Sequence, residues 1–103
     1  MTLKDYQNRK IRLETNRWEH INENHPETIG QVKLIEDTLF HPDYIQEGNN
    51  KEFLAIKRFF KTPVSENKYC VVVYKVMGLD GFIITSYFTR RPSFKRKLIW
   101  KKQ

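Results

Sequence analysis

The chain has 103 residues, of which 39% are hydrophobic and 14% aromatic, and its formal net charge is +7. This length suits one domain with a modest core, so residues 1–103 are expected to fold as a single domain. One cysteine excludes an internal disulfide framework and a cysteine-based zinc cluster. No apolar signal segment or membrane-spanning window is evident, which predicts a cytoplasmic protein that does not enter a membrane.

The charge is divided unevenly along the chain. Residues 1–50 contain six Lys/Arg and nine Asp/Glu, whereas residues 51–103 contain thirteen and three. The last sixteen residues hold seven Lys/Arg and no acid, and hydrophobic side chains interleave with these cations. Such a basic half predicts one cationic face, and nucleic acid is the polyanion that fits it best. A solvated basic tail is the alternative interpretation.

In chain order, residues 10–15 alternate weakly and predict a short first strand. Asn16 is a candidate N-cap for a helix through about Asn24, with Glu19 completing a capping box. Pro26 stops that helix, and Thr28 can cap the next one. The second helix carries its apolar residues on one face and ends at the His41-Pro42 pair; these residues are Ile29, Val32, Ile35 and Leu39.

The second half of the chain predicts strands. Residues 48–51 form a turn, residues 53–60 favour strand over helix, and residues 68–76 are the clearest strand. Asp80-Gly81 predicts a hairpin into a last long strand, and residues 97–101 a charged edge strand. The expected fold is α+β, with an N-terminal strand and two helices packed on a twisted four- to five-stranded antiparallel sheet.

The last long strand combines an apolar face with a face rich in hydroxyls. Strict alternation places the better core residues on one side, namely Phe82, Ile84, Ser86 and Phe88. The other side then carries Ile83, Thr85, Tyr87 and Thr89, and leads into Arg90 and Arg91. Hydroxyl and guanidinium groups both donate hydrogen bonds to anionic oxygens, so this side predicts a phosphate ligand.

The first helix offers a candidate general base. Trp18 and Ile21 are expected to anchor it, which leaves His20 at the boundary of the buried stripe. An imidazole there can accept and return a proton near neutral pH, although a hydrogen-bonded structural histidine is an equal alternative. His25 precedes a proline and is expected to lie in a loop or at the helix end.

Histidine, hydroxyls and cations suffice for RNA cleavage without a metal. A base deprotonates the ribose 2′-hydroxyl, a cation stabilises the phosphorane, and an acid protonates the leaving 5′-oxygen. His20 could be the base, and Thr85 and Tyr87 could bind phosphate or act as the acid. Lys57 and Arg58 face opposite sides of their strand, and Arg58 is preferred as the cation for its bidentate fork. No Cys/His/carboxylate spacing or Gly-rich loop predicts a metal or cofactor.

Several stretches together resemble a known family. They are Trp18-x-His20-Ile21 with His25-Pro26-Glu27, Thr38-Leu39-x-x-Pro42, Val71-Val-Val-Tyr-Lys75 and Gly81-Phe-Ile-Ile-Thr-Ser-Tyr-Phe-Thr89. In this order, over roughly residues 11–100, the chain resembles the phage-barnase-like group of the barnase–EndoU–colicin–RelE superfamily. The resemblance implies helices on a four- or five-stranded antiparallel sheet and metal-independent RNA cleavage. It also implies an active histidine, matching His20, and a late-strand hydroxyl, matching Thr85, or Ser86 if strand parity is inverted.

The sequence therefore predicts a small endoribonuclease, a toxin or a phage enzyme, whose partners are RNA and an antitoxin or immunity protein. The RNA-binding residues expected around its catalytic group are His25, Lys57, Ser86, Thr89, Arg90 and Arg91. Two alternatives stay open. One is a non-catalytic nucleic-acid-binding module that uses the basic half. The other is a protein-interaction domain whose acidic and basic halves meet.

Overall fold

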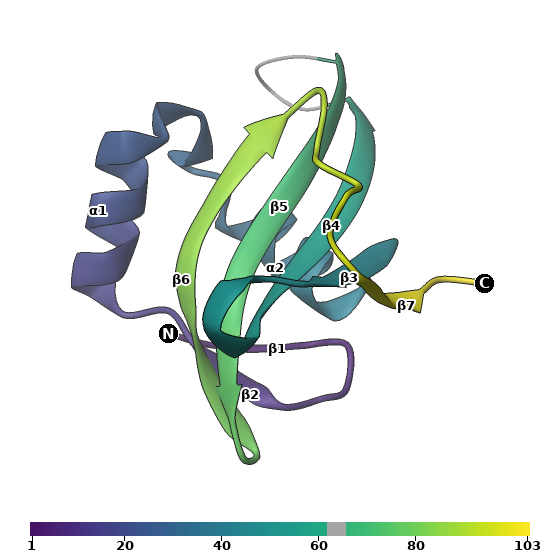
Figure 1. Cartoon of the computed structure of the whole chain (residues 1–103). Coiled ribbons are helices and arrows are strands. Elements are labelled where there is room, and N and C mark those ends of the chain that lie inside the picture. The colour runs from purple at the N-terminus through teal and green to yellow at the C-terminus, as the bar shows by residue number, and fades with distance from the viewer. Residues whose placement is uncertain (62–65) are drawn as a thin grey trace.

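The structure is a computed structural model that describes residues 1–61 and 66–103. Two helices pack on a seven-stranded mixed sheet, so the predicted α+β class is confirmed (Figure 1). The strands are β1 (Thr2–Lys4), β2 (Lys10–Arg12), β3 (Tyr44–Glu47), β4 (Glu52–Lys61), β5 (Glu66–Met77), β6 (Asp80–Thr89) and β7 (Leu98–Lys101). The helices are α1 (Thr15–Asn24) and α2 (Val32–Phe40), with short 3₁₀ turns η1 (Pro26–Thr28) and η2 (Asn49–Lys51).

The sheet is larger than the predicted four to five antiparallel strands. Its order is β1-β2-β6-β5-β4-β3-β7, in which β2 and β6 run parallel and the other neighbours antiparallel. Two N-terminal strands, β1 and β2, replace the single one expected. β2 lies within the strand predicted over residues 10–15, whereas β1, with three residues, and β3, with four, are too short to show a clear period in the sequence.

Helix α1 stands beside β6 and buries Ile21 against it (Figure 1). It begins at Thr15, and Glu14 at the N-cap makes no side-chain hydrogen bond. The predicted capping box of Asn16 and Glu19 is therefore wrong. The helix ends at Asn24, before the proline, as the sequence predicts.

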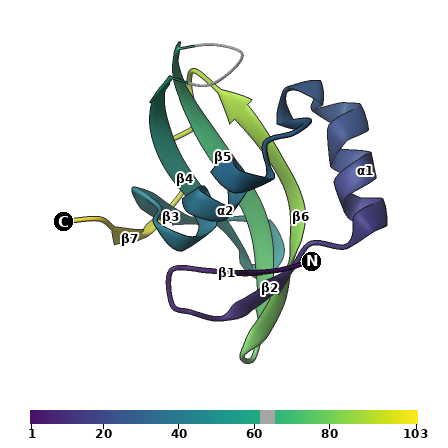
Figure 2. The ribbon, with the colours of Figure 1, turned by 180° about the vertical axis from the view of Figure 1, so that it is seen from behind.

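Helix α2 covers the sheet on the side seen in Figure 2, where it crosses β4 and β5. Ile35 and Leu39 are buried beneath it, and it ends before His41-Pro42, as predicted. Thr28 does not cap α2. Its hydroxyl lies buried in η1, where it donates to the His25 carbonyl oxygen at 2.7 Å and accepts from the Asn22 amide at 2.8 Å.

Hydrophobic residues are buried on both faces of the sheet. The larger cluster lies on the helix side, and its sheet residues include Ala55, Cys70, Val72 and Tyr74. A smaller cluster lies on the other side, which we call the open face. The open face is formed by alternate residues of four strands: Tyr44, Gln46, Leu54, Ile56, Arg58, Tyr69, Val71, Val73, Thr85, Tyr87 and Thr89.

A β-bulge changes the expected alternation of β6. Thr85 pairs with Val73 and Ile83 pairs with Tyr74, which leaves Ile84 as the extra residue. Ile83 is therefore buried on the helix side, and its predicted place beside Thr85 is wrong. Beyond the bulge the prediction is right, since Ser86 and Phe88 face the helix side.

The hairpin between β5 and β6 turns at Gly78 and Leu79 rather than at Asp80-Gly81. Met77 pairs with Asp80 across the loop, and Gly78 has a φ of 68°. A positive φ at the first loop residue is what a type II′ turn requires, and glycine adopts it readily. Gly81 lies within the strand instead.

Cys70 is buried on the helix side, and this burial raises the pKa of its thiol to about 11. The unfolded chain would form the thiolate at a lower pH, so it releases a proton that the folded chain retains. Rising pH then favours unfolding, and we expect ~2 kcal/mol of stability to be lost as the pH rises from about 9 through 11. Urea denaturation at a series of pH values measures this loss.

Cys70→Ala is the matched control, because it removes the thiol but not the buried tyrosines. Burial also raises the pKa of Tyr74, so some alkaline loss is expected in the variant as well. The difference between the two proteins in the free energy of unfolding lost over this pH range is the contribution of the thiol. Equal alkaline losses would contradict the assignment.

Candidate active site

The open face brings the predicted hydroxyls and a cation into adjoining rows across the sheet. One row contains Thr89, Tyr69 and Arg58, paired from β6 through β5 to β4. In the next row Tyr87 pairs with Val71, and in the third Thr85 pairs with Val73. Neighbouring strands lie roughly 5 Å apart, so the backbones at Arg58 and Thr89, with Tyr69 between them, lie roughly 10 Å apart.

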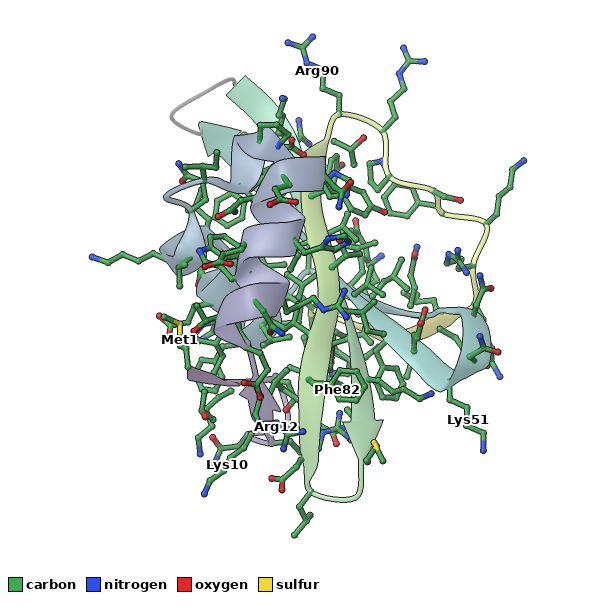
Figure 3. The ribbon with its side chains drawn as sticks, turned by 90° about the vertical axis from the view of Figure 1, so that its left-hand side faces the viewer. Met1, Lys10, Arg12, Lys51, Phe82 and Arg90 are labelled. Atoms are coloured by element: carbon green, nitrogen blue, oxygen red, sulfur yellow. The ribbon has the colours of Figure 1, made fainter. Side chains whose placement is uncertain are left out.

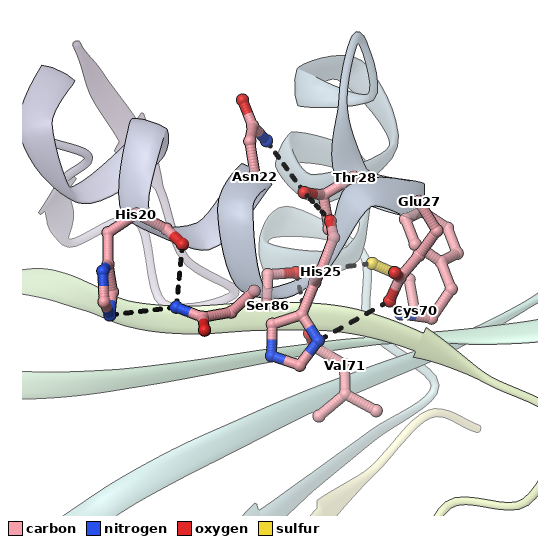
Figure 4. Close-up of polar contacts among 10 residues, drawn as sticks. His20, Asn22, His25, Glu27, Thr28, Cys70, Val71 and Ser86 are labelled. Carbon is pink, nitrogen blue, oxygen red and sulfur yellow. Dashed lines mark hydrogen bonds and ion pairs between the residues drawn. The ribbon is translucent and has the colours of Figure 1, made fainter.

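His25 joins this face from the end of α1. Its backbone N–H donates to the Ile21 carbonyl oxygen and ends the helix, with φ −133° and ψ 77°. The imidazole then lies 5.5 Å from the ring of Tyr87, centroid to centroid, with the planes inclined by 34°. Figure 4 shows His25 reaching past β6 toward the side on which Val71 lies. The helix end thus delivers an imidazole to the open face.

Glu27 places a carboxylate beside that imidazole. Its Oε2 lies 3.8 Å from His25 Nδ1 and accepts the backbone N–H of Phe88 at 3.2 Å. The bond to β6 holds the carboxylate in place, facing the imidazole. Nothing in the sequence beyond the His25-Pro26-Glu27 stretch pointed to a role for Glu27.

His20 has a different environment from His25. It is exposed, and its Nε2 lies 3.1 Å from the amide nitrogen of Asn24, one turn further along α1. The same amide donates to the carbonyl oxygen of His20 at 3.0 Å (Figure 4). With Asn16 and Arg17 it lines an open cavity of about 330 Å³. The contacts of His20 are thus within its own helix, whereas His25 contacts Tyr87.

The guanidinium of Arg58 lies on the open face, and that of Arg96 donates to Oδ1 of Asn49 at 3.3 Å. Arg58 lies over Phe60 at 5.0 Å and over Tyr69 at 5.9 Å, which keeps its side chain on this side of β4. Arg96 acts electrostatically on Tyr87: burial raises the pKa of that phenol, and the Arg96 charge opposes the rise. Arg96 belongs to the basic C-terminal run and was not singled out by sequence reasoning.

The segment of residues 90–97 carries Arg96 across the open face (Figure 1). Phe94 contacts Tyr44 and Tyr69 edge to face, with ring centroids 5.5 Å and 6.2 Å apart. The Gln46 amide donates to the Ser93 carbonyl oxygen at 3.0 Å. These contacts with β3 and β5 hold the segment on the open face.

Arg90 and Arg91 directly follow β6, as the sequence predicts. The backbone N–H of Arg91 donates to Thr89 Oγ1 at 3.2 Å. Figure 3 shows Arg90 extending from this end of the sheet. Both residues are exposed.

Two residues predicted to bind RNA lie on the helix side instead. Lys57 donates to the His41 carbonyl oxygen at 2.8 Å and lies 3.9 Å from Asp37, at the end of α2. Ser86 is buried, and its hydroxyl donates to the Val71 carbonyl oxygen at 2.8 Å. Ser86 therefore faces away from the open face, and the register places Thr85 there instead.

Among the described residues, no group of three or more His, Cys, Asp or Glu side chains could hold a metal ion. No helix in the described part of the chain is both long and apolar enough to cross a bilayer. Comparisons with protein-family models, with curated proteins and with solved structures found no match. The chemistry of the open face has to be inferred from its own residues.

Proposed function

We propose that the protein is a metal-independent endoribonuclease of the phage-barnase-like group, acting in the cytoplasm as a toxin or phage enzyme. Its partners would be RNA and an antitoxin or immunity protein. The observation that supports this proposal is the position of the His25 imidazole, beside the Glu27 carboxylate and Tyr87. Base, hydroxyl and cation then meet on one face of the sheet.

In the proposed reaction His25 takes the role that the sequence analysis gave to His20. His25 Nε2 accepts the proton of the ribose 2′-hydroxyl, which attacks the adjacent phosphorus, and Glu27 stabilises the resulting imidazolium. Tyr87 donates its proton to the leaving 5′-oxygen. A phenol keeps its proton at neutral pH, and burial raises the pKa of Tyr87 further.

The remaining residues of the open face bind the reacting phosphate. Arg58 and Arg96 neutralise the charge that develops on the non-bridging oxygens, and Thr85 and Thr89 donate hydrogen bonds to them. His20 and Arg17, which share a cavity on α1, would contact the RNA strand beyond the cleaved bond. Arg90 and Arg91 would contact it at the other end of β6.

Incubation with total RNA in excess EDTA tests the proposal. We expect cleavage to continue, because no step needs a metal, and the products to end in 2′,3′-cyclic phosphate. A DNA oligonucleotide and a 2′-O-methyl RNA are the controls, and both should stay intact because they lack the attacking hydroxyl. Cleavage that EDTA abolishes, or that also occurs on DNA, would contradict the mechanism.

A non-catalytic nucleic-acid-binding module is the second candidate. The thirteen Lys/Arg and three Asp/Glu of residues 51–103 favour it, as do the exposed rings of Phe94 and of Phe60, which lies beside Arg58. Aromatic rings stack on bases, and cations bind the phosphates between them. Salt-sensitive binding of RNA without any product in the assay above would support this candidate over the enzyme.

A further inference from the structure

The sheet ends in a strand whose outer edge is open. β7 pairs with β3 on one side, and no described strand pairs with its other side (Figures 1 and 2). Backbone N–H and C=O groups along such an edge can pair with another polypeptide strand. The edge lies on β7, whereas the candidate active site is centred on β6.

Large hydrophobic side chains are exposed on this edge strand. Leu98 is 49% exposed, Ile99 42% and Trp100 36%. Phe40, at the end of α2, is 42% exposed. Lys101 charges one end of this edge, and the three consecutive exposed hydrophobes beside it indicate an interaction surface.

A cavity adjoins this strand. It has a volume of about 400 Å³, and its lining includes Phe40, Lys57, Trp100 and Lys102. Trp100 is held at its rim by Tyr6, with ring centroids 5.2 Å apart. The cavity is large enough for an apolar side chain projecting from an added strand.

The charge around β7 selects the kind of partner. Residues 95–102 contain five Lys/Arg and no acid. Asp43 lies 3.9 Å from Lys102 and Asp37 lies 3.9 Å from Lys57, so both acids near the cavity already have cationic partners. A second copy of the chain would set like charges against each other, and this is unfavourable across a strand pair. An acidic partner is complementary.

We propose that β7 binds an extended, acidic segment of a partner protein, which adds a strand to the sheet. Backbone pairing would give affinity, one apolar side chain would enter the cavity beside Trp100, and acidic side chains would pair with the lysines. RNA is a poorer fit, because it has neither a polypeptide backbone to pair with a strand edge nor aliphatic groups to pack on the exposed Leu98 and Ile99. The proposal is independent of the proposed nuclease function.

Synthetic heptapeptides in which glutamate alternates with valine, leucine or phenylalanine test this proposal on the whole chain. We expect at least one to bind at low salt in calorimetry and to slow hydrogen exchange at the backbone amides of residues 98–101. Trp100→Ala should weaken binding about tenfold or more, since it removes one wall of the cavity. Leu79→Ala, at the 83% exposed hairpin turn, is the matched control and should bind normally.

A peptide with proline at its central apolar position provides the backbone control, because proline cannot donate to a strand ladder. Equal binding of this peptide, or no binding by any peptide, would overturn the proposal. The proposal would also be overturned if an RNA oligonucleotide slowed hydrogen exchange at the same amides and Trp100→Ala removed that effect. Slowing that depends on protein concentration without peptide would show a second copy as the occupant, and would overturn it too.

Discussion

His25→Ala is expected to reduce RNA cleavage by at least ~100-fold, the usual scale for the loss of a general base. The reason is that His25 is the imidazole that contacts Tyr87 and faces a carboxylate. The measurement is the rate of cleavage of a defined RNA under single-turnover conditions. The melting temperature should change little, since His25 lies at the helix end and is partly exposed.

His20→Ala is the matched control for this prediction. Its ring bonds to Asn24 on the same helix, so we expect a smaller loss that appears mainly in RNA binding. If His20→Ala abolished cleavage while His25→Ala left it unchanged, the base would be His20, as the sequence predicts.

Glu27→Gln adds a further test. It keeps an oxygen for the Phe88 N–H but removes the charge, and we expect about a tenfold loss.

Gly81→Ala is expected to destabilise the fold by about 2–3 kcal/mol, the upper range for overpacking a well-packed site. A Cβ at this position would press against the Lys75 carbonyl oxygen and would lie 2.9 Å from Cδ1 of Ile11. The contact with the Lys75 carbonyl oxygen cannot relax freely, because Gly81 pairs with Ile11 on β2 and with Val76 on β5. Urea denaturation of the two proteins measures the difference.

Gly30→Ala is the control that distinguishes a steric clash of the new side chain from strain in the backbone. Gly30 has a φ of 77° and nothing within 4 Å of its absent Cβ, so its replacement strains the backbone without a clash. We expect a loss of about 1 kcal/mol there. If Gly81→Ala cost no more than Gly30→Ala, close packing would not be the reason for glycine at position 81.

Whether a helix or strand could be predicted from the sequence depended on its length. The two helices and the long strands β4, β5 and β6 have enough residues for periodicity to identify them. β1 and β3 do not, and the parallel pairing of β2 with β6 joins residues about seventy positions apart. The bulge at Ile84 follows from how β5 and β6 pair, and for that reason strict alternation misplaced Ile83.

The candidate site divides in the same way. The residue types on β6 and the basic C-terminal run were evident from the sequence, and so was the opposite facing of Lys57 and Arg58. The residues that these groups contact were not evident from the sequence. The carboxylate of Glu27 binds the backbone of Phe88, and Phe94 packs on Tyr44 and Tyr69; both contacts join segments distant in the chain.

By itself the sequence determined the α+β class, the long elements and a supply of imidazole, hydroxyl and guanidinium groups. Those features arise from local periodicity and composition, which neighbouring residues carry. Only the tertiary structure decided which histidine lies beside the β6 hydroxyls, which serine is buried, and that β7 leaves an apolar edge open. Each of these depends on contacts between segments distant in the chain, and no local pattern encodes the register at which such segments meet.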